Sequence, residues 1–168
     1  LEGLDSAKAT RALDTGHATL LEESGLFLDP VLPREKLLIL GAGHVGRALA
    51  AITPGLGFAV TVGDERREFL EPERFPAGVE TRLGSFTDIV ASYPFDLSTY
   101  VVVVTRGHLC DLECVRAVLG RTYRYAGFMG SRRKSRLVLE QVLADGFDRA
   151  KVDALYAPIG QEIGAETP

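Results

Sequence analysis

The stretch Leu37-Leu38-Ile39-Leu40-Gly41-Ala42-Gly43-His44-Val45-Gly46 decides the fold of this chain. Its four leading apolar residues show no polar alternation, which predicts a strand buried on both faces. In the G-x-G-x-x-G spacing that follows, Gly41 allows a sharp turn, Gly43 lets the backbone approach a pyrophosphate, and Gly46 lets a helix pack closely on the strand. The stretch therefore predicts the first strand, turn and helix of a dinucleotide-binding α/β domain.

The helix expected after this turn would direct its amino end at the bound anion. Its free amides and its positive dipole end favour phosphate without any charged side chain. His44 lies in the first helical turn, where it is either a ligand contact or an exposed polar residue. We expect the cofactor-binding loop to comprise Gly41, Gly43, His44, Val45 and Gly46.

An acidic residue follows at the distance that such a domain requires. Asp64 comes 18 residues after Gly46, directly after an apolar stretch, where a carboxylate could accept bonds from the adenosine ribose hydroxyls. This position favours NAD over NADP, although Asp64 could also merely cap a turn. Arg66 and Arg67 lie just beyond, and an arginine there can pair with a 2′-phosphate or stack on adenine, which weakens the preference for NAD.

From Lys36 onward, short apolar runs alternate with helical stretches, which is the pattern of a parallel sheet covered on both faces. We expect a doubly wound, mostly parallel, Rossmann-like α/β sheet in three αβα layers. The runs 37–40 and 101–104 should be its central strands, with ligands in the loops after Leu40 and Val104, where the strand order reverses. The expected strands are 36–40, 58–63, 79–83, 99–105 and 124–129, and the expected helices are 44–53, 86–92, 110–119 and 131–145, the last with Gly146 as its C-cap.

The amino-terminal part has a different character. Residues 1–33 are expected to be a helical segment, with helix-prone residues at 7–13, and a linker marked by two prolines, while 34–168 forms the Rossmann-type domain. The length suits one domain with a substantial core. Because the chain begins at Leu1 instead of Met and stops at a Thr-Pro typical of a helix start, we expect a piece of a longer protein.

Bulk properties exclude several classes of function. The net charge of −4 gives no general attraction to nucleic acid or anionic lipid. The longest apolar run, Tyr100–Val104, is far shorter than the roughly 20 residues of a membrane helix, so we expect a soluble, cytoplasmic protein. Cys110 and Cys114 would need two more ligands to hold a metal, with His108 the nearest candidate, so we interpret them as buried, reduced core residues and expect no metal site.

A second group of polar residues follows the fourth expected strand. Thr105-Arg106-Gly107-His108 precedes Asp111 and Glu113, which places a histidine and two carboxylates near the ligand crevice as a possible acid–base set. For Glu113 we favour a structural role, because carboxylates stabilise the first turn of a helix. His108 and Asp111 are thus the catalytic candidates, and Thr105, Arg106 and His108 are expected to contact the ligand.

A basic segment follows the fifth expected strand. Six basic residues and no acidic one lie between Arg121 and Arg136. Part of the segment is a solvated face, but Gly130-Ser131-Arg132-Arg133 opens a helix, so Ser131 can cap it and the two arginines can reach an anion over the sheet edge. A nucleic-acid role would need a broader basic surface or stacking aromatics, and the aromatics here alternate as in a strand.

These blocks resemble the C-terminal Rossmann domain of the XdhC/CoxI family, the xanthine dehydrogenase accessory factors. The resemblance covers nearly everything from Leu26 to Pro168. Its marks, in order, are the glycine loop, Asp64-Glu65-Arg66, Thr105–His108 with Asp111, Gly127-Phe128-Met129-Gly130-Ser131-Arg132-Arg133-Lys134, and Ala157-Pro158-Ile159-Gly160 with Ile163-Gly164-Ala165.

The resemblance implies a maturation factor that binds molybdenum cofactor, assists its sulfuration and delivers it to a molybdenum hydroxylase such as xanthine or carbon monoxide dehydrogenase. A chaperone is therefore expected more than a catalyst, with a hydroxylase client, a sulfurtransferase and a second copy of the chain as partners. The family's usual Thr-His-Asp-His loop reads Thr105-Arg106-Gly107-His108 here, so one His and one Asp are missing. The Cys-Gly-Gly type motif of full-length members does not occur in these residues.

Two alternatives remain open at this stage. One is an NAD(P)-dependent oxidoreductase whose acid–base residue is His108. The other is an interaction module that has kept the fold and lost the ligand. The residues likewise leave the ligand open between NAD, NADP and the pterin cofactor.

Overall fold

The computed structural model describes residues 6–22, 24–31, 33–161, 163 and 164. They divide into two compact units, the first ending at Arg34 and the second beginning at Glu35. The first unit holds a helix, α1 (Ser6–Thr15), and an antiparallel hairpin of β1 (Thr19–Leu21) and β2 (Leu26–Leu28). The helix was expected and the hairpin was not, because strands of three residues are too short to show a periodicity.

The second unit is built on a five-stranded parallel sheet. Its strands are β3 (Lys36–Leu40), β4 (Ala59–Asp64), β5 (Glu80–Leu83), β6 (Thr99–Val103) and β7 (Tyr125–Phe128), in the order β5-β4-β3-β6-β7. Leu38 of β3 pairs with Thr61 on one side and with Val101 on the other, so β3 and β6 are adjacent at the point where the order reverses. All five predicted strands are confirmed, and so is the position of the switch point.

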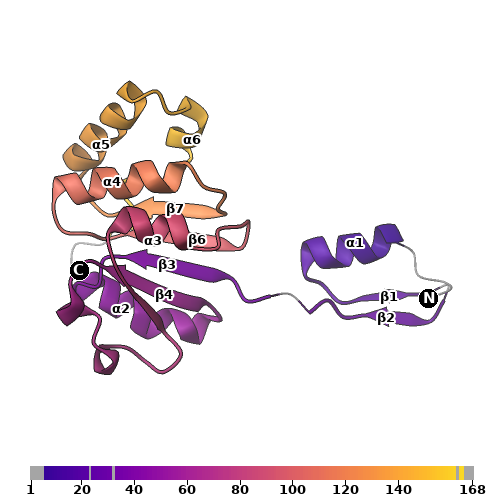
Figure 1. Cartoon of the computed structure of the whole chain (residues 1–168). Coiled ribbons are helices and arrows are strands. Elements are labelled where there is room, and N and C mark those ends of the chain that lie inside the picture. Colours follow the sequence, from indigo (N-terminus) through magenta and orange to yellow (C-terminus); the bar gives the residue numbers. More distant parts are fainter. Residues whose placement is uncertain (1–5, 23, 32, 162, 165–168) are drawn as a thin grey trace. The chain divides into compact units, whose positions relative to one another are not determined.

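Helices cover both faces of this sheet (Figure 1). The helix α2 (His44–Ile52) lies on one face, and α3 (Phe86–Ser92), α4 (His108–Leu119) and α5 (Arg132–Ala144) lie on the other. The predicted three-layer Rossmann-like architecture is therefore confirmed. Four short elements were not expected, namely α6 (Arg149–Asp153), η1 (Thr53–Leu56), η2 (Arg67–Phe69) and η3 (Pro72–Arg74).

The alternation of side chains along β3 creates the two halves of the core. Leu38 and Leu40 are completely buried with residues of α3, α4 and α5, whereas Ile39 is completely buried with Ala50 of α2 on the opposite face. Because both faces are covered, the strand shows no polar alternation, as its sequence predicted.

The closing segment of the domain extends the sheet beyond β7. The Tyr156 N–H donates to the Ala126 carbonyl at 3.0 Å, and the Ile159 N–H donates to the Phe128 carbonyl at 2.8 Å. A Cβ at Gly127 would lie 2.4 Å from Ile159 Cδ1 and 2.8 Å from the Tyr125 hydroxyl oxygen, so a larger residue would displace these side chains where this segment crosses β7. Two of the sequence blocks that carry the family resemblance thus pack against each other.

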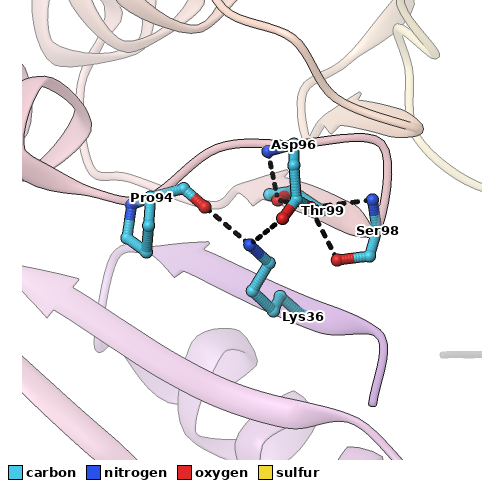
Figure 2. A network of polar contacts seen from close by, with 5 residues as sticks. All are labelled: Lys36, Pro94, Asp96, Ser98 and Thr99. Atoms are coloured by element: carbon cyan, nitrogen blue, oxygen red, sulfur yellow. Dashed lines mark hydrogen bonds and ion pairs between the residues drawn. The ribbon is translucent and has the colours of Figure 1, made fainter. Parts of the chain in front are cut away.

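A polar network ties the amino ends of β3 and β6 together, at the end of the strands opposite to the glycine turn (Figure 2). The Lys36 ammonium donates to the Pro94 carbonyl and to Asp96 Oδ2, both at 2.6 Å. The other oxygen of Asp96 accepts from the Ser98 N–H and hydroxyl at 2.9 and 2.6 Å. The bonds from Lys36 and Ser98 hold the pKa of Asp96 well below its usual range.

None of the helices in the described part of the chain is long and apolar enough to cross a membrane.

Candidate functional site

The three glycines of the first turn have different structural roles. Gly41 has a φ of +114°, and a Cβ there would lie 2.6 Å from the Val104 carbonyl oxygen. A Cβ on Gly46 would lie 1.9 Å from the Gly41 carbonyl oxygen, which no backbone adjustment of a few tenths of an ångström could relieve. Gly43 has an ordinary φ of −66° and nothing within 4 Å of a Cβ. The fold therefore requires Gly41 and Gly46 but does not require Gly43.

Gly43 is also the N-cap residue of α2, and it provides no side chain that could cap the helix. The amides of the first helical turn have no partner within an α-helix, and most helices satisfy them with a Ser, Thr, Asp or Asn side chain. The amides of His44, Val45 and Gly46 thus face the space that the missing side chain leaves open. That arrangement suits an anion at the positive end of the helix dipole.

Asp64, at the end of β4, ties the glycine turn to the neighbouring strand. Its Oδ2 accepts the Ala42 N–H at 2.8 Å, and its Oδ1 accepts the Arg66 N–H at 3.0 Å. The Arg66 guanidinium donates to both oxygens, at 2.9 and 3.0 Å, and its carbon lies 3.8 Å from the centre of the Phe69 ring. Burial alone would raise the pKa of Asp64, but the bonds from Arg66 and Ala42 outweigh it and hold that pKa below its usual value.

A second buried carboxylate lies on the other side of the switch point. Asp111, in the first turn of α4, is completely buried. The Thr105 hydroxyl donates to one of its oxygens, and the Lys134 ammonium of α5 pairs with the other. The Lys134 side chain remains 30% exposed, so the pair directs its positive end outward and its negative end into the protein.

A cavity of about 550 Å³ lies over the switch point. Within the part of the chain that the structure describes, its lining includes three cations and no acidic side chain, although the chain as a whole is net negative. An adjoining cavity of about 390 Å³ shares Arg66, Phe69 and Arg106 with it. The larger cavity is lined by Gly43, His44, Val45, Arg66, Phe69, Val104, Thr105, Arg106, Met129, Gly130, Ser131 and Lys134.

The structure separates the residues expected from the sequence into three groups. Those that line the larger cavity are Gly43, His44, Val45, Arg66, Thr105, Arg106 and Ser131. Those that are buried and outside that lining are Gly41, Gly46, Asp64 and Asp111, of which Asp64 lines the adjoining cavity. Arg132 and Arg133 are exposed on α5 outside that lining, and the side chain of His108, the first residue of α4, lies outside the described part of the structure.

Lys134 is the one charged residue of the described cavity lining that was not expected from the sequence, and Phe69, Val104, Met129 and Gly130 are uncharged ones. Ser131 caps α5 as predicted, since its hydroxyl accepts the Lys134 N–H at 3.2 Å. Positions three apart on a helix share a face, so when a cap residue lines a cavity, the residue three positions later faces the same cavity. That spacing could have favoured Lys134 over Arg132 and Arg133.

The two cysteines differ from each other. Cys114 is buried in the core, as predicted, whereas Cys110 is only partly buried and lines the adjoining cavity. Burial raises the pKa of both thiols, and for Cys110 the carboxylates of Glu65, Glu113 and Asp111 add to the effect. Neither is therefore an activated thiolate. Among the described residues, no group of three or more His, Cys, Asp or Glu is placed to hold a metal ion.

In order along the sequence, the strands of the sheet lie 3-2-1-4-5, and a glycine turn followed by a helix lies at the switch point. These features define the class of Rossmann-type dinucleotide-binding domains. More narrowly, the chain belongs to the XdhC Rossmann domain family, whose model matches residues 37–168.

The chain is also similar to two curated proteins and to solved structures. The uncharacterized protein YqeB of Escherichia coli K12 is 35% identical over 136 residues, and a probable xanthine dehydrogenase subunit of Bacillus subtilis 168 is 23% identical over 159 residues. These matches cover 80% and 94% of the chain, which spans 25% and 46% of the two relatives. A crystal structure of a xanthine dehydrogenase from Bacillus halodurans has a TM-score of 0.68 and 28% identity, covering 80% of this chain and 39% of that one.

Proposed function

We propose that this domain binds a phosphate-bearing nucleotide or pterin ligand in the 550 Å³ cavity and serves the maturation of a molybdenum hydroxylase of the xanthine dehydrogenase type. The observation that carries the ligand proposal is Gly43, the one glycine of the turn that the protein's own packing does not require. Family membership and the names of the relatives from the two Bacillus species support the link to xanthine dehydrogenase.

The cavity has the size and the charge for such a ligand. Pockets for small molecules and cofactors usually enclose roughly 300 to 1,000 Å³. A pyrophosphate placed at Gly43 would meet the first-turn amides of α2, and Arg106 lies at the rim. A second anionic group would lie near Ser131 and Lys134, although Ser131 already caps α5, so its hydroxyl would act as a neighbour and not as the main donor.

The molybdenum cofactor, which the family implies, is a pterin that carries a phosphate. The residues present fit its anionic end, because a Cβ at Gly43 would fill the space in front of the uncapped α2 amino end. When bound, the cofactor supplies the redox centre of the client enzyme. The residues of this chain would hold the phosphate at Gly43 to Gly46 and orient the ligand over Thr105 and Met129.

If this domain takes part in sulfuration, its role would be to present the cofactor to the sulfur donor. The pKa of the Cys110 thiol, which lines the adjoining cavity, is raised by burial and by nearby carboxylates, so this thiol is a poor sulfur carrier at neutral pH. We therefore assign the delivery of sulfur to a partner sulfurtransferase and insertion to contact with the hydroxylase client.

Hydride transfer to or from NAD(P) is a second candidate function, which the same cavity supports less well. It would use His108 and Asp111 as acid–base residues. Asp111 is completely buried and bonded to Thr105 and Lys134, so it can influence a ligand only through those two side chains.

The test is calorimetric titration of the full-length protein with ADP, NAD⁺, NADP⁺ and isolated molybdopterin. Gly43→Ser should lower affinity about tenfold or more, because a side chain would displace the phosphate while capping α2 itself. Gly55→Ser is the matched control, since a Cβ there also meets nothing within 4 Å but the residue lies outside the cavity. The ligand proposal is wrong if none of the four compounds binds, or if Gly43→Ser binds them as the wild type does.

A further inference from the structure

Resting on the proposed nucleotide site, we propose that the cavity selects ribose that carries a 2′-phosphate over ribose with free hydroxyls. In this class of domain, a carboxylate at the end of the second strand of the fold accepts bonds from the ribose hydroxyls in NAD proteins, whereas a nearby arginine accommodates the 2′-phosphate in NADP proteins. The chain has both residues, Asp64 and Arg66. Their geometry decides which of them a ligand meets.

Asp64 has no acceptor capacity left for a ribose hydroxyl. An ionised carboxylate offers about four lone-pair sites. All four are used within the domain, by the Ala42 N–H, the Arg66 N–H and two guanidinium N–H groups, at 2.8 to 3.0 Å. Only 1% of the Asp64 side chain is exposed. The carboxylate that would favour NAD is therefore saturated, and although Asp64 lines part of the adjoining cavity, almost none of its side chain is exposed there.

Arg66, in contrast, keeps donors available. A guanidinium has five N–H groups, and two of them bond to Asp64, which leaves three. The Arg66 side chain is 32% exposed and lines both cavities, as does Arg106. Asp64 and the Phe69 ring hold the guanidinium in place. Because the Arg66 side chain is already ordered, it would lose little conformational entropy when a phosphate binds.

The charges around Arg66 indicate on which side the phosphate would lie. Glu65 and Glu68 line the adjoining cavity and would repel a dianion there. The larger cavity has Arg66, Arg106 and Lys134 in its lining and no described acidic side chain. A 2′-phosphate is therefore expected between Arg66 and Arg106, on the side of the larger cavity.

The contacts between Asp64 and Arg66 predict the effect of a single substitution. Arg66→Ala would remove the phosphate partner and at the same time free one acceptor site on each oxygen of Asp64, while the backbone N–H bonds from residues 42 and 66 remain. Preference should therefore invert, with NADP⁺ binding more weakly and NAD⁺ more tightly than to the wild type. Arg67→Ala is the matched control, because Arg67 is the exposed neighbour and lines neither cavity.

The experiment is calorimetric titration of the full-length wild type and both variants with NADP⁺ and NAD⁺, with unfolding midpoints recorded for each protein. We expect the wild type to bind NADP⁺ about tenfold more tightly or better, the contribution of one charge-assisted hydrogen bond. Arg67→Ala should keep that ratio and Arg66→Ala should reverse it. A wild type that prefers NAD⁺ overturns this inference but leaves the ligand site standing. A wild type that binds neither NAD⁺ nor NADP⁺ also overturns this inference, and the ligand site fails with it only if ADP and molybdopterin do not bind either.

Discussion

The carboxylate of Asp111 lies beneath the ammonium group of Lys134 and joins the first turns of α4 and α5 under the cavity. Asp64 and Arg66 form a similar pair on the other side of the switch point. In both pairs the carboxylate is buried and the cation reaches the cavity. The domain thus places two of the three cations of the larger cavity, Arg66 and Lys134, in fixed positions, each paired with a carboxylate that does not line that cavity.

Lys134→Met should destabilise the domain because it leaves Asp111 buried without its counter-charge. The expected loss in free energy of unfolding is about 3 kcal/mol, near the lower end for a broken buried pair because Lys134 is partly exposed. Urea unfolding would measure it. Arg133→Met, at the exposed neighbouring position, should change stability by less than about 0.5 kcal/mol. Adding Asp111→Asn to Lys134→Met should recover part of the loss, and equal stability of Lys134→Met and the wild type would contradict the role of the pair.

Gly46→Ala should be far more damaging than Gly43→Ala. Alanine is favoured over glycine inside a helix by about 1 kcal/mol, so propensity alone would make Gly46→Ala stabilising. The new Cβ would instead lie 1.9 Å from the Gly41 carbonyl oxygen, and we expect a net loss above about 3 kcal/mol. Gly43→Ala, with open space around its Cβ, should stay within about 1 kcal/mol of the wild type. Thermal unfolding of the two variants would measure this difference. Similar unfolding midpoints would refute the conclusion that the fold requires Gly46 but not Gly43.

The Lys36–Asp96 contact should make stability depend on pH in the acid range. The folded-state pKa of Asp96 lies below the 3.8 of an unperturbed aspartate, so its stabilising contribution is full above that value and disappears as the pH falls through the folded-state pKa. The wild type should therefore exceed Asp96→Asn in unfolding midpoint at pH 7, and the difference should shrink as the pH falls below 4. A difference that stays constant from pH 7 to pH 3 would show that the charge of Asp96 is not responsible.

The sequence predicted those features of the fold that residues close together in the chain determine. The apolar run of β3, the glycine turn and the serine cap of α5 are each specified by neighbouring residues, and their boundaries lie within two residues of those expected. The family-typical Ala157–Gly160 block could be recognised, but its packing against β7, where Ile159 contacts Gly127, joins residues about thirty positions apart in the chain.

The charge pairs of the site could not be predicted in the same way. Asp64 was expected to meet a ribose because its position fits that role, and nothing in the sequence states that Arg66 folds back onto it. Asp111 looked like a candidate acid for the same reason, although burial and two partners now occupy it. The Ala42 N–H reaches Asp64 only when the ends of β3 and β4 are side by side, and Lys134 reaches Asp111 only when α4 and α5 are assembled, so these bonds cannot be seen in the sequence.

The most direct test of the central claim is mass spectrometry of the small molecules retained by the natively purified, full-length protein, with Gly43→Ser purified in parallel. We predict that the wild type retains a phosphate-bearing nucleotide or pterin and that Gly43→Ser, which should still fold because a Cβ there meets nothing within 4 Å, has lost it. A wild type that retains no such compound, or two proteins that retain the same one in equal amount, would contradict a ligand site at the glycine turn.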